Sequence, residues 1–293
     1  MPTLAQLLAT VPTSHATGRV RPSALPRMRD QTRLYGADHN DIDVAATARL
    51  LDISGLYWAS ADMTALAVSA GAALDELDFA LEARPELAGL MVFDGGVGST
   101  SYDGTVVPVD AVSWGPGPGS AGVVWIPWIA RWRIVEAAAA QGVELGTLPP
   151  PLVMLAVLPR GLGPIGRDEV GELLPMIAPT VAAWHLMAQP TLTDRWREPA
   201  DKKTRRAYAR DGRGEPDVTI IDLRQLYRPN DPAHAPDEQP GRYSHRWVVT
   251  GHWRNQRHGA GLVQRKRIWI PDHVKGPNGA PLLTRERVNV WRR

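Results

Sequence analysis

The sequence predicts an α+β protein in which helices flank a mainly antiparallel sheet and a basic C-terminal β-hairpin or barrel-like module follows. Three observations lead to this prediction. Short apolar and β-branched runs between residues 87 and 129 are separated by Gly-rich turns. Segments with helical spacing of apolar residues lie on both sides of that block. The chain has 293 residues, of which 44% are hydrophobic, so a real core is expected.

The N-terminal part is predicted to hold short helices. Residues 4–8 form a short apolar helix candidate, and residues 43–51 combine helical spacing with acidic residues near their start. The Pro- and Arg-rich segment 19–29 between them favours an extended arm. Further on, Gly71 predicts either a helix break or a strand followed by a helix over residues 72–83.

The middle of the chain is predicted to form an antiparallel meander with strands over residues 87–93, 105–114 and 121–129. Residues 131–141 either continue the meander or form a helix that stops at Gly142. Residues 152–158 suit a further strand.

After the meander, residues 167–189 carry the clearest apolar stripe of the second half. Pro175 and Pro179 predict a kink there, or two shorter helices. Residues 217–227 suit a strand, and residues 281–291 a final one.

Charge divides the chain unevenly. Residues 1–190 hold 11 Lys and Arg against 19 Asp and Glu, a net of −8, whereas residues 191–293 hold 22 against 12, a net of +10. We therefore predict an acidic α+β domain over 1–190, a basic and Pro-rich connector over 191–241, and a basic β module over 242–293. The basic part is either a solvated surface or a face for an anionic partner.

Composition excludes several classes of protein. The chain has no cysteine, which removes disulfides, thiolate catalysis and Cys-ligated zinc. No apolar run reaches about 18 residues, and the first residues lack the basic start of a secretory signal. We expect a cytoplasmic protein without a membrane segment.

The most distinctive stretch lies between Tyr243 and Pro271. It interleaves Arg with three Trp and three His, and its β-type runs 246–249 and 267–270 flank a polar, Gly-containing connection. We predict a hairpin from these two runs. Its candidate binding residues are His252, Trp253, Arg254, Arg257, Arg265, Arg267 and Trp269.

Catalytic and metal sites have little support in the sequence. His245, His252 and His258 are spaced by seven and six residues, unlike the tight His pairs of zinc sites. A metal-dependent hydrolase would need His252 with Asp272 or His273. Gly95 to Gly98 lacks the Lys and Ser/Thr of a phosphate-binding loop, and turns are the better interpretation. We expect no metal, no cofactor and no catalytic centre.

The same residues allow three kinds of surface. Arg and Lys neutralise phosphates while Trp and His stack on bases, which favours RNA or DNA. Arg beside Trp is equally typical of protein-binding hot spots. Alternatively, the Trp side chains are the core of a small barrel with Arg on its outside. In a strand, Arg265, Arg267 and Trp269 share one side.

The run Gly251-His-Trp-Arg254, followed by Arg267-Ile-Trp-Ile-Pro271, resembles the C-terminal signature of the second type V-A anti-CRISPR family. Further upstream, Leu173-Leu-Pro175 and Lys202-Lys203 match the order of family features loosely. The family's His-x-x-Arg-Arg run before Gly-His-Trp is replaced here by Val248-Val-Thr250.

The resemblance implies a phage or mobile-element effector without enzymatic activity. Such an effector would bind a host polypeptide, including one still being made with its RNA or ribosome, and would suppress a host defence or other protein. The alternatives are a sequence-tolerant RNA- or DNA-binding protein and the metal-dependent hydrolase. His252 and Trp253 are either contact residues or structural residues of the hairpin.

Overall fold

The computed structural model describes residues 4–8, 10–11, 20–37, 42–102, 104–117, 122–161, 163–224, 246–275 and 282–283. Contacts divide the chain into two compact units, residues 1–224 and residues 225–293. Both helices and antiparallel-rich sheets are present, which confirms the predicted α+β class.

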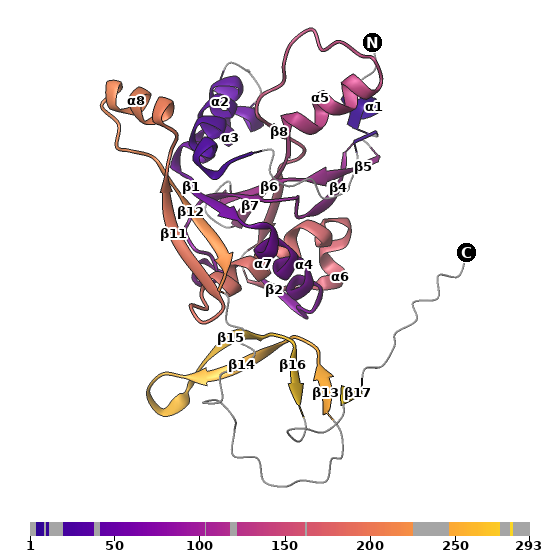
Figure 1. Cartoon of the computed structure of the whole chain (residues 1–293), viewed down its shortest axis with the longest axis vertical. Coiled ribbons are helices and arrows are strands. Elements are labelled where there is room, and N and C mark those ends of the chain that lie inside the picture. Colours follow the sequence, from indigo (N-terminus) through magenta and orange to yellow (C-terminus); the bar gives the residue numbers. More distant parts are fainter. Residues whose placement is uncertain are drawn as a thin grey trace, which may run out of the picture. The chain divides into compact units, whose positions relative to one another are not determined.

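An eight-stranded sheet forms the centre of the first unit (Figure 1). β1 pairs in parallel with β12 and β3, and the other described pairings are antiparallel. The spatial order is β11 (Thr193–Pro199), β12 (Asp217–Leu223), β1 (Gly55–Ala59), β3 (Gly89–Phe93), β6 (Ala111–Pro116), β7 (Gly122–Ala130) and β8 (Leu152–Met154), with β9 (Leu158–Gly161) also on β7.

The predicted meander is confirmed as β3, β6 and β7, which are antiparallel neighbours. One strand was missed. β4 (Gly98–Tyr102) lies inside the segment expected to be only a turn, and it pairs with β5 (Thr105–Val109) as a separate hairpin.

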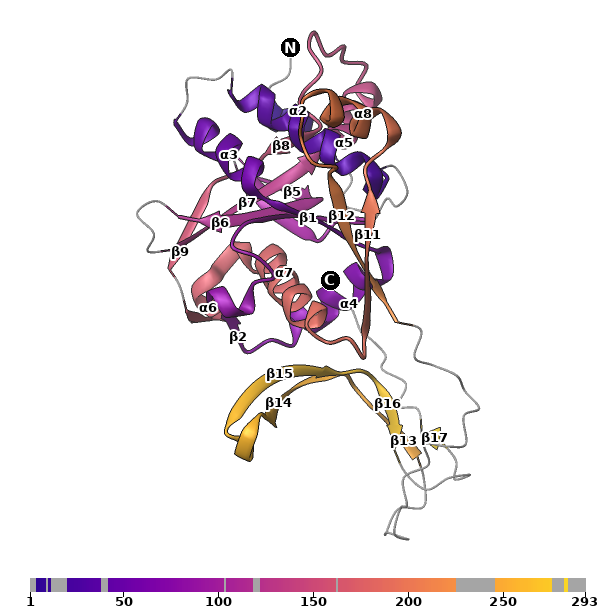
Figure 2. The same ribbon diagram turned by 90° about the vertical axis from the view of Figure 1, so that its left-hand side faces the viewer.

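Helices cover both faces of the large sheet (Figures 1 and 2). α2 (Leu25–Ala37) and α3 (Ile42–Ile53) lie on one face, and α4 (Ala61–Ala72) and α7 (Leu174–Met187) on the other. The remaining elements of the unit are α1 (Leu4–Leu8), η1 (Pro22–Ala24), β2 (Glu76–Asp78), η2 (Leu81–Ala83), α5 (Arg131–Ala140), β10 (Pro164–Gly166), α6 (Arg167–Val170), η4 (Gly171–Leu173) and α8 (Lys202–Arg210).

Each face of the sheet has its own aromatic core. On the α2–α3 face, Trp58 and Trp128 join a cluster of buried aliphatic side chains. On the α4–α7 face, Trp184 of α7 stacks on Trp125 with ring centroids 5.0 Å apart and meets Trp114 edge-to-face at 5.1 Å. Large apolar area of this kind is the main source of stability in such a layered fold.

The stretch Arg167–Met187 is long and apolar enough to cross a membrane by length and composition, but 67% of its most apolar window is buried inside the unit. It contains α6, η4 and α7, so the predicted division into shorter helices is found, although the interruption lies at residues 171–173 and not at a proline. Pro175 occupies the first turn of α7, where its missing N–H is not needed, and Pro179 lies inside the helix. The stretch thus belongs mostly to the core of the first unit.

Two local predictions in the N-terminal half are wrong. Much of the segment expected to be an extended arm belongs to α2, because Pro26 falls in the helix's first turn, where proline is tolerated. The expected break at Gly71 with a helix over residues 72–83 is replaced by α4, which runs through Gly71 and ends at Ala72. Gly71 is kept inside α4 because a Cβ there would lie 2.7 Å from the backbone of Ala178 in α7.

Residues 191–224 do not form the expected connector. They make the antiparallel pair β11–β12, with α8 between the two strands, at one side of the large sheet. The high charge of this segment misled the prediction, since most of its charged side chains are exposed although the segment forms two strands and a helix. Residues 225–245 of the predicted connector and module lie outside the described residues.

The second unit contains two small sheets. β13 (Arg246–Val249) pairs antiparallel with β16 (His273–Lys275) and parallel with β17 (Leu282–Leu283). β14 (His252–His258) pairs antiparallel with β15 (Gln264–Ile270). Among the described residues these strands do not close into a barrel, so the barrel-like alternative is not realised. Most of the predicted strand 281–291 lies outside the described part.

Candidate functional site

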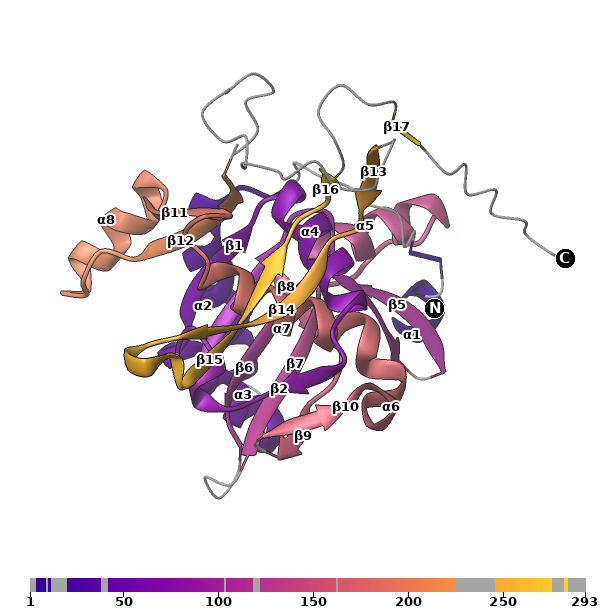
Figure 3. The same ribbon diagram turned by 90° about the horizontal axis from the view of Figure 1, so that it is seen from below.

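The predicted hairpin exists with a different partner. β15 pairs with β14, residue 252 opposite 270 through residue 258 opposite 264, and not with residues 246–249 (Figure 3). The chain turns at Gly259 and Gly261, whose φ angles of 77° and 65° suit glycine. Residues 252–258, expected to be a polar connection, are therefore a strand. We call the β14–β15 pair the ribbon.

The ribbon has two different faces, because residues directly opposite each other point to the same side. The Trp face carries Trp253, Asn255, Arg257, Arg265, Arg267 and Trp269. The opposite face carries His252, Arg254, Gln256, His258, Gln264, Lys266, Ile268 and Ile270. Five of the seven predicted site residues thus share the Trp face, while His252 and Arg254 lie on the other.

Trp269 holds the start of the ribbon together. Its ring meets that of Trp253 edge-to-face, with centroids 5.2 Å apart, and it is only 4% exposed. A Cβ on Gly251 would lie 2.5 Å from Cζ2 of Trp269, so the ring packs directly over that glycine. The Gly251 N–H donates to Oδ1 of Asp272. Gly251 and Trp253 thus take part in the packing at the start of the ribbon.

Four cations of the ribbon are exposed. They are Arg254, Arg257, Arg265 and Lys266, and none of them makes an ion pair or side-chain hydrogen bond with another described residue. Residues 246–275 contain seven Lys and Arg but one acidic residue, Asp272, which already binds Gly251. The ribbon thus presents positive charge without internal compensation. Lys266 is not among the seven candidate binding residues, and alternation along β15 places it on the face opposite Arg265 and Arg267.

The histidines near the ribbon make backbone contacts. Nδ1 of His252 lies 3.1 Å from the Thr250 carbonyl oxygen, and Nδ1 of His273 lies 3.0 Å from that of Pro271. Within the described ranges, no three His, Asp or Glu side chains come together in a way that could hold a metal ion. His245 lies outside those ranges.

The Gly95–Gly98 loop lines a pocket of about 460 Å³ in the first unit, together with Arg133 and Arg167. The loop is followed by β4, not by the helix that a phosphate-binding loop requires. Both guanidinium groups have internal partners. Arg133 pairs with Asp110 at 2.7 Å, and Arg167 donates to carbonyl oxygens at the end of α4. These contacts describe a packing role for both cations.

Comparison with known proteins yields a structural similarity. No family model matches the chain, and no curated protein matches it. Among solved structures, the crystal structure of AcrVA2, a type V-A anti-CRISPR protein, superposes with a TM-score of 0.37 and 11% sequence identity, covering 85% of this chain and 85% of that one. This similarity does not bear on the Gly-His-Trp signature, whose resemblance to the family stays a prediction from the sequence.

Proposed function

We propose that this protein is a non-enzymatic effector that acts by binding a host polypeptide, and that the ribbon is its contact surface. One observation carries the proposal. Among the described strands, β14 and β15 pair only with each other, so each leaves one edge open. An open edge presents backbone N–H and C=O groups to which an extended polypeptide can add as a further strand.

The side chains beside these edges favour a partner with carboxylates. Arg257 and Arg265 are directly opposite each other on the Trp face, and both are exposed. Like charges in such a pair oppose folding of the ribbon. A bound acidic side chain would remove that repulsion and gain two charge-assisted hydrogen bonds. We therefore expect the bound segment to be extended and acidic.

The wider biological role rests on the sequence resemblance alone. It suggests a cytoplasmic phage or mobile-element protein that suppresses a host defence or other protein, in the manner of anti-CRISPR inhibitors. A polypeptide that is still being made would be extended when it meets the ribbon. This is the state that strand addition requires, and RNA or a ribosome would accompany such a partner.

The second candidate function is sequence-tolerant binding of RNA or DNA by the ribbon itself. It is favoured by the charge of residues 246–275, which contain seven basic residues and one acidic residue. A nucleic-acid complex would weaken steeply as salt rises, because bound phosphates release counterions. A polypeptide added to a strand edge through backbone hydrogen bonds would respond much less.

Affinity capture from host cells with two matched double variants tests the proposal. R257Q/R265Q removes two charges from the Trp face, and R254Q/K266Q removes two from the opposite face of the same ribbon. We expect the first variant to lose the partner and the second to retain it. Captured proteins are identified by mass spectrometry in RNase-treated and untreated samples.

The two treatments separate the candidates. A polypeptide that survives RNase and is lost only in R257Q/R265Q supports the proposal. Loss of all captured protein after RNase supports the nucleic-acid candidate instead. Equal capture by both variants and the wild type would show that the ribbon is not the contact surface.

A further inference from the structure

α8 carries its charge on one side. Thr204 and Tyr208 are buried, whereas Lys202, Lys203, Arg206 and Arg210 are exposed. Residues 202, 206 and 210 lie one above another, about 6 Å apart along the helix axis. None of the four cations makes an ion pair with another residue in the described part of the chain. Like charges at this spacing repel, so the arrangement does not serve the helix itself.

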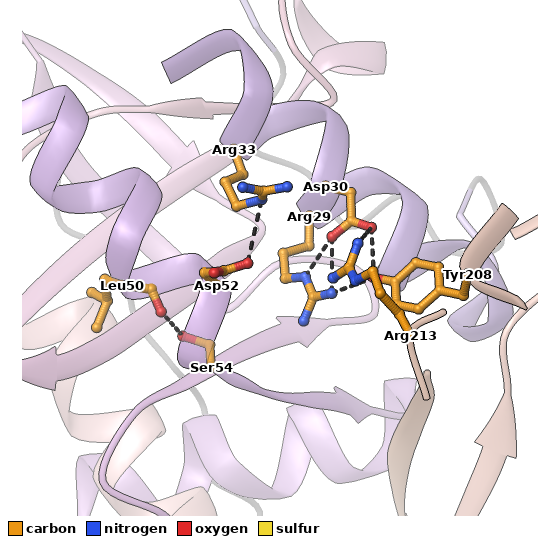
Figure 4. Close-up of polar contacts among 8 residues, drawn as sticks. All are labelled: Arg29, Asp30, Arg33, Leu50, Asp52, Ser54, Tyr208 and Arg213. Carbon is orange, nitrogen blue, oxygen red and sulfur yellow. Dashed lines mark hydrogen bonds and ion pairs between the residues drawn. The ribbon is translucent and has the colours of Figure 1, made fainter. Parts of the chain in front are cut away.

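The buried side of α8 is clamped to α2 (Figure 4). The Tyr208 hydroxyl donates to Asp30 and accepts a hydrogen bond from Arg29. The guanidinium of Arg213 lies 4.0 Å from the centre of the Tyr208 ring and 3.5 Å from the Asp30 carboxylate. Burial, with the bond to Asp30, raises the pKa of Tyr208, so the hydroxyl stays neutral.

The first turn of α8 is fixed as well. Asp201 caps the helix by accepting the Thr204 N–H at 2.9 Å, and its own N–H donates to the Ser23 carbonyl. The clamp and the cap together hold the helix in one orientation, with its cations pointing away from the body of the unit. Preorganised cations lose little entropy when they bind an anion.

A pocket of about 690 Å³ adjoins the N-terminal end of α8, since Asp201 both caps the helix and lines the pocket. Arg21, Arg27 and Arg131 also line it, with the Arg27 guanidinium 3.8 Å from the Asp201 carboxylate and that of Arg131 donating to the Pro149 carbonyl oxygen. Trp132 lines the pocket as well, and the Arg133 guanidinium lies 4.6 Å from the centre of its ring. The pocket therefore brings an aromatic residue and several arginines beside the first residue of α8.

We propose that α8 and this pocket form a binding site for single-stranded nucleic acid. Phosphates would follow Lys202, Arg206 and Arg210 along the helix, and a base would enter the pocket beside Trp132. Cationic tracks with an aromatic stacking surface are the usual components of single-strand recognition. The site belongs to the first unit and does not depend on the function proposed for the ribbon.

Other anionic partners fit the surface less well. A helix that binds a membrane surface presents large apolar side chains toward the lipid. On α8 the one large aromatic side chain, Tyr208, is buried against α2. An acidic polypeptide would satisfy the cations but has no planar group to fill the pocket beside Trp132.

Fluorescence anisotropy with the full chain and a labelled 12-nucleotide RNA, repeated with DNA of the same sequence, tests the site. In K202Q/R206Q/R210Q we expect about tenfold weaker binding and a plot of log affinity against log salt shallower by about two, because each lost phosphate contact removes about 0.7 from the slope. The control R49Q/R195Q/R197Q removes three exposed arginines elsewhere in the first unit and should bind like the wild type.

The pocket has its own probe. An abasic strand of equal length and charge should bind about tenfold more weakly, because the stacked base is missing. Equal affinity of the two strands would overturn the base pocket. Four results would overturn the nucleic-acid site on α8. They are unchanged binding by the α8 variant, no binding by the wild type, loss of binding only in R257Q/R265Q, and equal displacement of the strand by polyglutamate. Circular dichroism melts establish that every variant is folded.

Discussion

The ring of Trp269 lies across the ribbon from that of Trp253 and over the backbone of Gly251. This relationship separates two roles that the sequence presents together. The Gly-His-Trp motif supplies the glycine and one of the two rings that fix the ribbon's first residues. The exposed cations further along, Arg257 and Arg265, remain accessible to a partner.

Replacing Gly251 with alanine should destabilise the ribbon. The new Cβ would lie 2.5 Å from Cζ2 of Trp269 and 2.8 Å from Oδ1 of Asp272. Overpacking of this kind costs about 1–3 kcal/mol. Amide hydrogen exchange over residues 252–270 should become faster, whereas T250A, a change at the neighbouring exposed residue, should leave it unchanged. Exchange at the wild-type rate in G251A would contradict the packing described here.

Reversing one charge of the facing arginine pair should stabilise the ribbon and weaken binding. In R265E a carboxylate faces Arg257 in place of a like charge, which is worth about 0.2–1 kcal/mol. Slower amide exchange over the ribbon with loss of the captured partner is the expected result. R254E faces Ile268 and should give no such gain. A less protected ribbon in R265E would show that the two arginines do not repel.

Gly71 should not tolerate a side chain despite its position in a helix. Alanine is a better helix former by about 1 kcal/mol, but its Cβ would meet the backbone of Ala178 and Pro179 at 2.7 Å. Because backbone atoms cannot move aside easily, we expect a net loss of about 1–3 kcal/mol in thermal denaturation. G146A, with no atom within 4 Å of the new Cβ, is the control. A higher melting temperature in G71A would rule out close contact of α4 with α7.

The contributions of Asp110 and Arg133 to the free energy of unfolding should depend strongly on each other. Arg133 is 2% exposed and Asp110 6% exposed, and Asp110 also accepts the Ala130 N–H. D110N keeps the shape but leaves a buried guanidinium without its counter-charge, which costs about 3–5 kcal/mol. In urea denaturation, D110N combined with R133M should recover part of that loss. Additive effects of the two changes would contradict a direct interaction.

The Asp201 cap of α8 should make the stability of the protein depend on pH in the acidic range. The hydrogen bond from the Thr204 N–H holds the pKa of Asp201 below its ordinary value of 3.8. Desolvation opposes this shift, whereas the Thr204 hydroxyl and Arg27 add to it. The stabilisation by Asp201 is thus fully present above about pH 4 and is lost as pH falls through the lower folded-state value.

Thermal unfolding across acidic pH measures this contribution. D201N keeps an acceptor for the cap and should show a flatter dependence on pH, while D201A should lose about 1 kcal/mol at neutral pH. A pH profile in D201N identical to that of the wild type would show that this carboxylate is not the titrating group.

Parts of the candidate site followed from the sequence. Alternation along residues 265–269 places Arg265, Arg267 and Trp269 on one side, and the register agrees. The strand partner did not follow, because residues 252–258 are polar and read as a connection, whereas the structure places the turn at residues 259–261. Asp272 was considered only as a metal ligand, although its carboxylate binds the Gly251 N–H.

Local patterns determined the helices and strands whose signals lie within a few residues. Residues 43–51 correspond to α3, and Gly142, with a φ of 64°, follows the end of α5 as its chemistry predicts. The absence of cysteine and the uneven charge are likewise properties of the sequence alone.

Only the tertiary structure decided the contacts between distant residues. The charged segment 191–224 forms two strands and a helix because Tyr208 hydrogen-bonds to Asp30 and β12 pairs with β1. The tertiary structure also divided the arginines of the ribbon between two faces by setting the register of β14 against β15. Pairing and burial depend on residues far apart in the chain, and no local pattern contains that information.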